Sequence, residues 1–457
     1  MSPMTVDLEL VRKYNVPGPR YTSYPPATQF TDRVPVERVA ESVRRNNETA
    51  RDLSLYFHLP FCETLCWFCG CTTVITTDPQ KSATYIEYLG KEMALLQPRL
   101  HPQRKVVQLH FGGGSPTFSP PDHLRRLGEL IHDRFTFAPD VEAGVEIDPR
   151  RLTRDHLTAL RELGFNRASI GVQDNNPVVQ KAVHRTQPLE LTAQVVEWIR
   201  EAGFSSLNVD LIFGLPFQTP ASFELTLEEI LALNPDRFAV FSYAHVPWMK
   251  PAQRILKPEA LPSAETKLQL LKVTIERLAA AGYVYIGMDH FARAGDELAV
   301  AQRQRTLQRN FQGYSTRGGA DIYAFGMSSI SAANGTYWQN VKDLPAYYAM
   351  LDAGRMPYAR GFILSPDDLI RRETIMQIMC NLVLDYAAMT ARLGVPFPEY
   401  FARELASLDD LEADGLLRRG PAALTVTELG RLFLRIIAMR FDAYLPALKE
   451  RRHAMTI

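Results

Sequence analysis

The chain has 457 residues, of which 46% are apolar, and its 51 Lys and Arg residues balance 51 Asp and Glu residues. This composition excludes a disordered or fibrous protein, and the zero net charge excludes a general attraction to nucleic acid or anionic lipid. The N-terminus lacks a basic start followed by an apolar core, and no later apolar run could cross a bilayer, so we expect a cytoplasmic protein with reduced thiols.

The first region, residues 1–50, is predicted to hold a short helix followed by an extended arm. The arm reads P-G-P-R-Y-T-S-Y-P-P over residues 17–26, where the prolines and Gly18 prevent regular helix. Arg20, Tyr21 and Tyr24 could cover a pocket, although composition alone favours a packed strap. A lid role for Arg20 is a hypothesis.

From residue 53, short apolar runs alternate with longer amphipathic helices. Six runs have the character of β-strands: residues 53–59, 106–111, 143–148, 167–173, 206–213 and 237–243. This alternation predicts an α/β fold with a parallel sheet, an incomplete (β/α)6 barrel of the TIM type. Chemistry in such a barrel gathers at the C-terminal ends of the strands.

The loop after the first strand holds four of the five cysteines. Cys62, Cys66 and Cys69 form the pattern C-x3-C-x2-C, which is too tight for a disulfide framework and one ligand short of a closed zinc site. Three thiolates favour an iron–sulfur cluster that keeps one iron open to a substrate. Cys71 would close the site as a fourth ligand, but Gly70 allows the chain to turn it away, and we expect it outside the ligand set.

Other strand ends carry residues that suit a ligand. Gly112, Gly113 and Gly114 follow the second strand and permit close backbone approach, although a plain turn is equally consistent with them. A Glu or Gln at a strand end suits ribose hydroxyls, and an Arg suits a carboxylate. The candidates of this kind are Glu146, Gln173 and Arg185, with a surface salt bridge as the alternative for Arg185.

The fifth and sixth strands add further candidates. Asp210 is a carboxylate within an apolar strand, so we interpret it as functional rather than as a paired core residue. Ala244 and His245 follow the sixth strand. Cys380 lies at helical spacing among apolar residues and is predicted to pack in the core.

The sequence pattern changes in the later part of the chain. Residues 283–331 either close over a ligand or extend the sheet as a βαβ edge, and the pattern does not separate these alternatives. We therefore assign residues 51–360 to the barrel with its extension and residues 361–457 to a mainly helical C-terminal domain. Its last part resembles a winged-helix-like module, but it lacks the basic excess of a DNA-binding protein.

The cysteine pattern, with Phe68 before the last cysteine, resembles the signature of the radical S-adenosylmethionine (radical SAM) enzymes. Several longer sequence motifs make the resemblance closest to the oxygen-independent coproporphyrinogen III oxidases of haem biosynthesis. These motifs are P-G-P-R-Y-T-S-Y-P, E-I-D-P-R, G-V-Q-D, I-F-G-L-P, G-M-D-H-F-A and N-F-Q-G-Y. That family oxidatively decarboxylates two propionates of coproporphyrinogen III to vinyl groups, using a 5′-deoxyadenosyl radical made from SAM.

The resemblance also implies site residues. Cys62, Cys66 and Cys69 would hold a 4Fe–4S cluster whose fourth iron binds SAM, with Cys71 not a ligand. The positions implied for the cluster-bound SAM are Tyr56, Gly113, Glu146 and Ile330. Those implied for a second SAM are Gly114, Ser115, Gln173, Arg185, Asp210 and Ala244. His58 is expected near the cluster, and His184 stands where Asn is expected.

The implied partners are coproporphyrinogen III and an electron donor such as a flavodoxin or ferredoxin, and a monomer is the expected state. Two relatives with the same core are alternatives, a haem chaperone and an anaerobic haem-degrading methyltransferase. The R-Y-T-S-Y-P arm argues against the chaperone. A non-catalytic metal-binding module is the alternative from another class.

Overall fold

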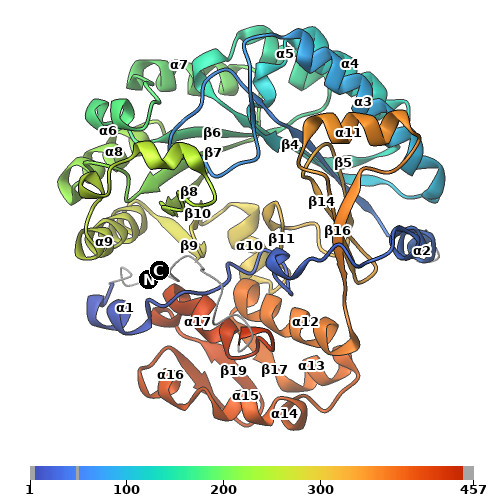
Figure 1. The fold of residues 1–457 in the computed structure, drawn as a ribbon. Helices are drawn as coiled ribbons and strands as arrows, with labels where there is room; N and C mark the ends of the chain where they lie inside the picture. Colours follow the sequence, from blue (N-terminus) through green and yellow to red (C-terminus); the bar gives the residue numbers. More distant parts are fainter. Residues whose placement is uncertain (1–5, 48–50, 446–457) are drawn as a thin grey trace.

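The computed structural model describes residues 6–47 and 51–445, and the ends of the predicted N- and C-terminal regions lie outside these ranges. Six parallel strands follow one another across the centre of one large sheet, as predicted, and form the arc of an incomplete barrel (Figure 1). These strands are β1 (Leu53–Leu59), β4 (Val106–Gly113), β5 (Phe137–Ile147), β6 (Arg167–Gln173), β7 (Ser206–Phe213) and β8 (Arg237–Ser242).

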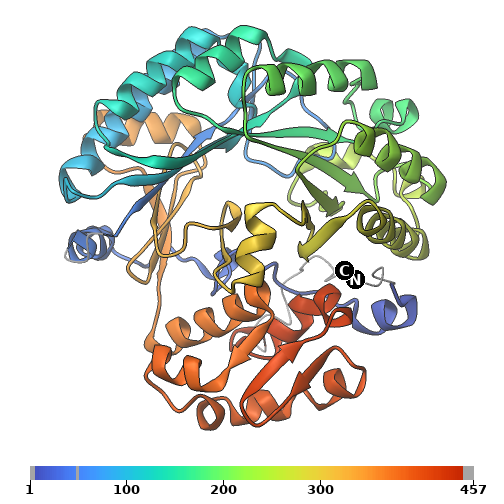
Figure 2. The same ribbon diagram turned by 180° about the vertical axis from the view of Figure 1, so that it is seen from behind.

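Helices cover the outer face of this arc (Figures 1 and 2). They are α3 (Gln80–Leu96), α4 (Pro121–His132), α5 (Arg154–Glu162), α6 (Pro177–Ala182), α7 (Leu189–Glu201), α8 (Pro220–Ala232) and α9 (Ala264–Ala280). Strand β6 shows why the two faces of the sheet differ. Ala168, Ile170 and Val172 are buried against the helices, while the alternate residues Ser169 and Gln173 are half-buried. The interior of the barrel is therefore left with polar side chains.

Residues 283–363 lengthen the sheet at both edges. Strands β9 (Tyr283–Gly287) and β10 (His290–Arg293) join beyond β8, and β13 (Asp321–Phe325) joins parallel to β1. Strands β14 (Ile330–Ala333), β15 (Thr336–Asn340) and β16 (Tyr358–Ile363) then follow antiparallel. The remaining elements here are α10 (Glu297–Arg303), α11 (Leu344–Asp352) and the hairpin of β11 (Gln308–Asn310) and β12 (Gly313–Ser315).

These edges correct the βαβ alternative, because most of the added pairs are antiparallel. A physical reason is visible between β14 and β15, where Asn334 and Gly335 have φ of 46° and 68°. Consecutive left-handed residues form the tight turn that joins antiparallel strands, and Asn-Gly is the dipeptide that best tolerates it. The Asn334-Gly335 dipeptide is the sequence feature that indicates this hairpin.

The N-terminal segment packs as a strap. It runs from α1 (Leu8–Tyr14) between the sheet and the C-terminal region to α2 (Val36–Asn46) (Figure 1). Tyr21 and Tyr24 are buried, and the Tyr21 hydroxyl donates to Asp442 at 2.8 Å. Arg435 donates to the carbonyls of Gly18 and Pro19. The arm is therefore held by its backbone as well as by its aromatic rings.

The C-terminal region combines helices with a small sheet. Its helices are α12 (Pro366–Asn381), α13 (Tyr386–Leu393), α14 (Phe397–Tyr400), α15 (Ala402–Ala406), α16 (Asp409–Ala413) and α17 (Leu434–Met439). Strands β17 (Val383–Asp385), β18 (Leu417–Arg419) and β19 (Ala423–Val426) form an antiparallel sheet in the order β17-β19-β18. Both views place this region below the open side of the barrel (Figures 1 and 2).

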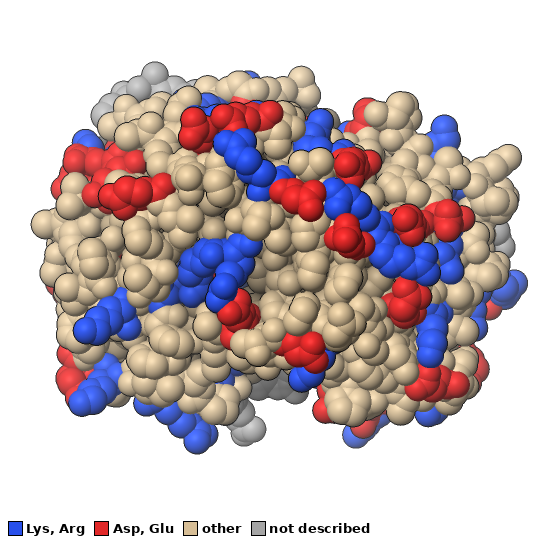
Figure 3. All heavy atoms as spheres, turned by 90° about the horizontal axis from the view of Figure 1, so that it is seen from above, with Lys and Arg blue, Asp and Glu red and all other residues tan. Residues whose placement is uncertain are grey.

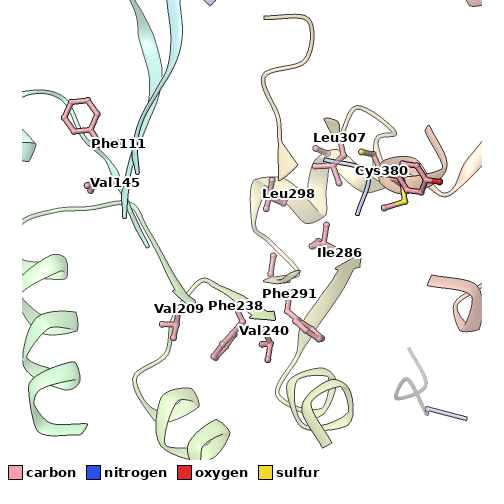
Figure 4. Close-up of a cluster of buried hydrophobic side chains, with 14 of the residues drawn as sticks. Phe111, Val145, Val209, Phe238, Val240, Ile286, Phe291, Leu298, Leu307 and Cys380 are labelled. Carbon is pink, nitrogen blue, oxygen red and sulfur yellow. The ribbon is translucent and has the colours of Figure 1, made fainter. Parts of the chain in front are cut away.

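Cys380 joins this region to the barrel core. It is 1% exposed and lies in the main hydrophobic cluster, near Leu307 and Ile286 (Figure 4). Burial raises the pKa of this thiol to about 12, so it stays protonated and acts as a small apolar group. The structure agrees with the packing role predicted for it.

The surface carries mixed charge. On the face in Figure 3, acidic and basic side chains are interspersed rather than gathered into one field. This distribution matches the balanced composition of the chain. Among the described residues, every helix is too short or too polar to span a bilayer.

Glu92 of α3 is expected to hold the turn between β13 and β14. This buried carboxylate accepts from Gly326 N at 2.8 Å, Asn340 Nδ2 at 2.7 Å and the Tyr347 hydroxyl at 2.6 Å. In Glu92→Gln the amide NH₂ would face a donor, so we expect the free energy of unfolding to fall by about 1–3 kcal/mol. Urea unfolding measures this, with Glu87→Gln on the exposed face of α3 as the control. Equal stability of the two variants would contradict the assignment.

Candidate functional site

One cavity of about 180 Å³ lies at the C-terminal ends of the parallel strands and beneath the cysteine loop. It brings together ten of the thirteen residues predicted for cluster and SAM binding: Cys62, Cys66, Cys69, Gly113, Gly114, Ser115, Glu146, Gln173, Arg185 and Asp210. Strand ends that are far apart in sequence converge here because neighbouring parallel strands end at the same edge of the sheet.

The glycine run is required by close contacts. A Cβ on Gly113 would lie 2.5 Å from Nδ1 of His58, and the φ of this residue is 113°. A Cβ on Gly112 would lie 2.9 Å from the Glu146 carboxyl group, which accepts a 3.1 Å hydrogen bond from Gly113 N. The chain therefore needs glycine at both positions to bring β4 and Glu146 together. These contacts favour a built site over a plain turn.

The cysteine loop is braced from several elements. It includes the short parallel strands β2 (Phe61–Cys62) and β3 (Val74–Ile75). His58 Nε2 lies 2.9 Å from the Thr72 carbonyl of this loop, and its expected place near the cluster stays a prediction. Lys250 Nζ donates to the Cys71 carbonyl at 2.8 Å, and Gln253 Nε2 donates to the Phe68 carbonyl at 3.0 Å. These bonds hold a loop that has little regular structure of its own.

His184 also braces this loop. Its ring stacks on Trp67 at 5.1 Å between centroids, and its Nδ1 lies 3.0 Å from the Leu65 carbonyl. The φ of His184 is 56°, a left-handed conformation in which Asn and His are both enriched. The departure from the expected Asn is therefore compatible with the backbone, and the imidazole adds a stacking contact.

Positive charge surrounds the thiols. Arg150 Nη2 and Arg185 Nη1 lie 3.6 Å and 3.7 Å from Cys66 Sγ. The pKa of Cys69 is lowered, first by hydrogen bonding from the Cys71 thiol and also by Lys250 and Arg185. The Cys71 backbone N–H lies 3.4 Å from Cys69 Sγ, and the side chain of Cys71 is exposed. This environment favours the thiolate of Cys69, the form that binds metal, whereas burial raises the pKa of the Cys62 thiol to about 12.

The donor set fits an iron–sulfur cluster. Within the described ranges, no three His, Cys, Asp or Glu side chains converge on the position of a single metal ion. Cys62, Cys66 and Cys69 line one cavity, where three thiolates could each bind a separate iron of one cluster. Arg185 is 7% exposed and its Nε has no partner among the described residues, so the cavity also has a buried donor available to a ligand.

Two site residues, Asp148 and Arg150, were missed by sequence reasoning. Asp148 forms ion pairs with Arg150 at 2.6 Å and with Arg185 at 3.3 Å. All three residues line the cavity. Burial opposes ionisation, but Arg185 and Arg150 lower the pKa of Asp148 to about 2. Both residues belong to the motif E-I-D-P-R at the end of the third predicted strand, which could have indicated them. The ion pair of Arg185 is buried, so the surface alternative for that residue is excluded.

Glu146 and Asp210 differ in charge although both line the cavity. Burial opposes ionisation of Glu146, but hydrogen bonding from His110 and Gly113 N lowers its pKa. For Asp210, burial is the largest effect and the charge of Glu146 the next, and together they raise the pKa to about 7. Hydrogen bonds from Asn208 and Ser169 lower the pKa but only partly offset this rise. With its pKa raised in this way, Asp210 can carry a proton near neutral pH, and the protonated carboxyl can donate as well as accept a hydrogen bond.

Three predicted residues lie outside the cavity lining. Tyr56 stacks on His110 at 5.8 Å between ring centroids, and its hydroxyl lies 3.2 Å from His58 Nδ1. Ala244 lines a neighbouring cavity, described below. Ile330 on β14 packs in a small cluster with Phe30 and Tyr337. The SAM contacts predicted for these three residues stay predictions.

Comparisons with known proteins cover nearly the whole chain. Residues 56–230 match the radical SAM superfamily, and residues 364–433 match the HemN C-terminal domain. An oxygen-independent coproporphyrinogen III oxidase of Synechocystis sp. is 47% identical over 96% of this chain and 95% of its own length. The corresponding protein of Escherichia coli is 46% identical over 96% of this chain and 95% of its own length.

A solved structure agrees with these sequence relatives. The coproporphyrinogen III oxidase (HemN) of Escherichia coli, described as a radical SAM enzyme, superposes with a TM-score of 0.92. It is 44% identical, and the match covers 97% of this chain and all of that one. The chain therefore belongs to the oxygen-independent coproporphyrinogen III oxidases, a family of radical SAM oxidoreductases.

Proposed function

We propose that this protein converts coproporphyrinogen III to protoporphyrinogen IX without oxygen, in haem biosynthesis. Each of two propionate side chains loses one hydrogen atom from its β-carbon, carbon dioxide and one electron, and a vinyl group remains. One observation carries the proposal: the three cysteines and the strand-end polar residues of this family line a single cavity.

We assign the cluster to Cys62, Cys66 and Cys69, with Cys71 outside the ligand set. A 4Fe–4S cluster at these thiols, when bound, supplies the electron that cleaves SAM to a 5′-deoxyadenosyl radical. The positive charge of Arg150 and Arg185 beside Cys66 offsets the thiolate charge.

The SAM-binding residues follow the family pattern. Gly113 and Glu146 are assigned to the cluster-bound SAM, together with Tyr56 and Ile330. The second SAM site is assigned to Gly114, Ser115, Gln173, Arg185, Asp210 and Ala244. The buried Nε of Arg185, which has no partner in the described part of the chain, supports this assignment, since a guanidinium can bind a carboxylate through two N–H groups.

Anaerobic turnover tests the function. The reconstituted protein is incubated with SAM, a reductant and coproporphyrinogen III, and the tetrapyrrole and 5′-deoxyadenosine are measured by mass spectrometry. The expected products are a tetrapyrrole lighter by two units of CO₂ and H₂, and 5′-deoxyadenosine. Cleavage of SAM without decarboxylation would overturn the substrate but leave the superfamily. A methylated product would favour the methyltransferase alternative, and absence of any SAM-perturbed cluster spectrum would favour a metal-binding module.

The proposal also covers the electron donor, the oligomeric state, the localisation and the domain boundaries. A small reduced redox protein, such as a flavodoxin or ferredoxin, would supply electrons to the cluster. We take the enzyme to be a cytoplasmic monomer, with residues 51–360 as the catalytic unit and residues 361–457 as its C-terminal domain.

A further inference from the structure

A second, larger cavity lies beside the cysteine site. Its volume is about 490 Å³, within the range of small-molecule sites, and Ala244 lines it. Its walls come from the ends of β7 and β8, the first turns of α9, the N-terminal arm and the region around α17. We call it the Lys267 cavity, after the lysine that α9 contributes.

The Lys267 cavity has an excess of positive charge. Among the described residues, four cations line it, Arg20, Lys267, Arg431 and Arg435, against one carboxylate, Asp289. Arg20 pairs with Asp289, and Arg431 lies 3.2 Å from Glu428. These arginines therefore have counter-ions, and Arg435 also bonds the carbonyls of the arm.

Lys267 differs from the arginines. Within the described residues its ammonium lies beyond 4 Å from every carboxylate, and its hydrogen-bond partner is the Tyr243 carbonyl at 3.4 Å. Burial lowers the pKa of Lys267, as expected for a cation removed from water without a counter-ion. A group so placed gains most from an anionic ligand.

The rest of the wall is mainly apolar, although Asn15, Ser242 and His245 also line it. The apolar lining residues are Phe213, Leu268, Leu271, Met288 and Trp248. A small inorganic anion would gain little from such a surface, whereas a large apolar ring that carries carboxylates would match both the cation and the wall. A tetrapyrrole with propionate side chains has this chemistry.

We propose that the Lys267 cavity binds the tetrapyrrole substrate, with the Lys267 ammonium holding one of its propionate carboxylates. The inference rests on the proposed function and adds to it a substrate site beside the cysteine cavity. A non-reacting propionate held here would orient the macrocycle, so Lys267 is a substrate-binding residue that takes no part in proton or electron transfer.

Binding of coproporphyrin III, the stable oxidised form of the substrate, tests the proposal. In Lys267→Met the dissociation constant is expected to rise about 10- to 100-fold, the range of one charge-assisted hydrogen bond. Lys267→Arg is expected to retain binding within about threefold, because the cation remains. The matched control is Lys272→Met on the same helix, where the lysine lies 3.8 Å from Glu276 and outside the cavity lining. Fluorescence titration of the four proteins gives the dissociation constants.

A measurement of SAM binding shows whether Lys267 binds the tetrapyrrole or SAM, which also carries a carboxylate. The reconstituted Lys267→Met protein is expected to bind SAM as the wild type does, measured from the cluster spectrum, and to show a raised KM for coproporphyrinogen III. Weakened SAM binding with unchanged coproporphyrin III affinity would overturn the proposal and assign Lys267 to SAM. If Lys267→Met does not fold, Lys267→Gln replaces it, with thermal unfolding as the check.

The outcomes distinguish this inference from the proposed function. Product formation by the wild type with an unchanged dissociation constant in Lys267→Met would refute the substrate site alone. Tight, Lys267-dependent binding without decarboxylation by the wild type would support the site and refute the reaction.

Discussion

Loss of the iron–sulfur cluster is the expected result of replacing Cys62, Cys66 or Cys69 by alanine. The three thiols line one cavity, and Arg150 and Arg185 lie within 3.7 Å of Cys66 Sγ. A cluster left with two thiolates loses one of its three anchors, so each variant should lack stable iron and should form no 5′-deoxyadenosine. Iron and sulfide analysis after anaerobic reconstitution, with the visible absorption spectrum, measures the loss.

Cys71→Ala is the control for these variants. Cys71 lines the same cavity, but its side chain is exposed and its backbone N–H, which alanine keeps, lies 3.4 Å from Cys69 Sγ. This variant is expected to keep the cluster and SAM cleavage, with a shifted spectrum because the thiol next to Cys69 is gone. Loss of iron in Cys71→Ala equal to that in Cys69→Ala would show that Cys71 is a ligand.

Gly113→Ala is expected to lower the rate of SAM cleavage by at least about 100-fold. The new Cβ would lie 2.5 Å from His58 Nδ1, and the φ of 113° disfavours any side chain. Either His58 leaves its bond to the Thr72 carbonyl or β4 moves away from Glu146, and a displacement near 1 Å at a reacting centre costs this much. The rate of 5′-deoxyadenosine formation in single turnover measures the effect.

Gly164→Ala separates the clash from backbone strain. Gly164 has a φ of 88°, but within the described residues its Cβ would meet no atom within 4 Å apart from its chain neighbours. This variant should lose about 1 kcal/mol of stability and keep normal SAM cleavage. Equal losses of activity in the two variants would mean that strain, and not contact with His58, explains the effect at Gly113.

Much of the architecture was predictable because it depends on local pattern. The six core strands and their parallel order follow from alternating apolar runs and amphipathic helices, and the structure confirms them. The antiparallel order of the added edge strands was not predicted, since strands of four to six residues give a weak periodic signal. The domain boundaries near residues 50 and 360 stay predictions.

The site was predictable where chemistry restricts residue type. Cysteine spacing and the glycine run identified the cluster loop and its neighbour, and ten of the thirteen predicted residues line one cavity. Asp148 and Arg150 were missed because each resembles an ordinary surface charge until the fold buries them beside Arg185. Ile330 was carried over from the family pattern, but the structure packs it in a separate cluster, so its role needs its own test.

The sequence by itself determined the cofactor chemistry and the type of fold, because cysteine spacing, glycine and strand periodicity act over short stretches of chain. Only the tertiary structure decided which charges are paired. Arg20 and Lys267 are both cations in the sequence, yet Arg20 pairs with Asp289, 269 residues away, while Lys267 meets no carboxylate within the described residues. Electrostatic energy depends on separation in space and on burial, and neither can be obtained from position along the chain.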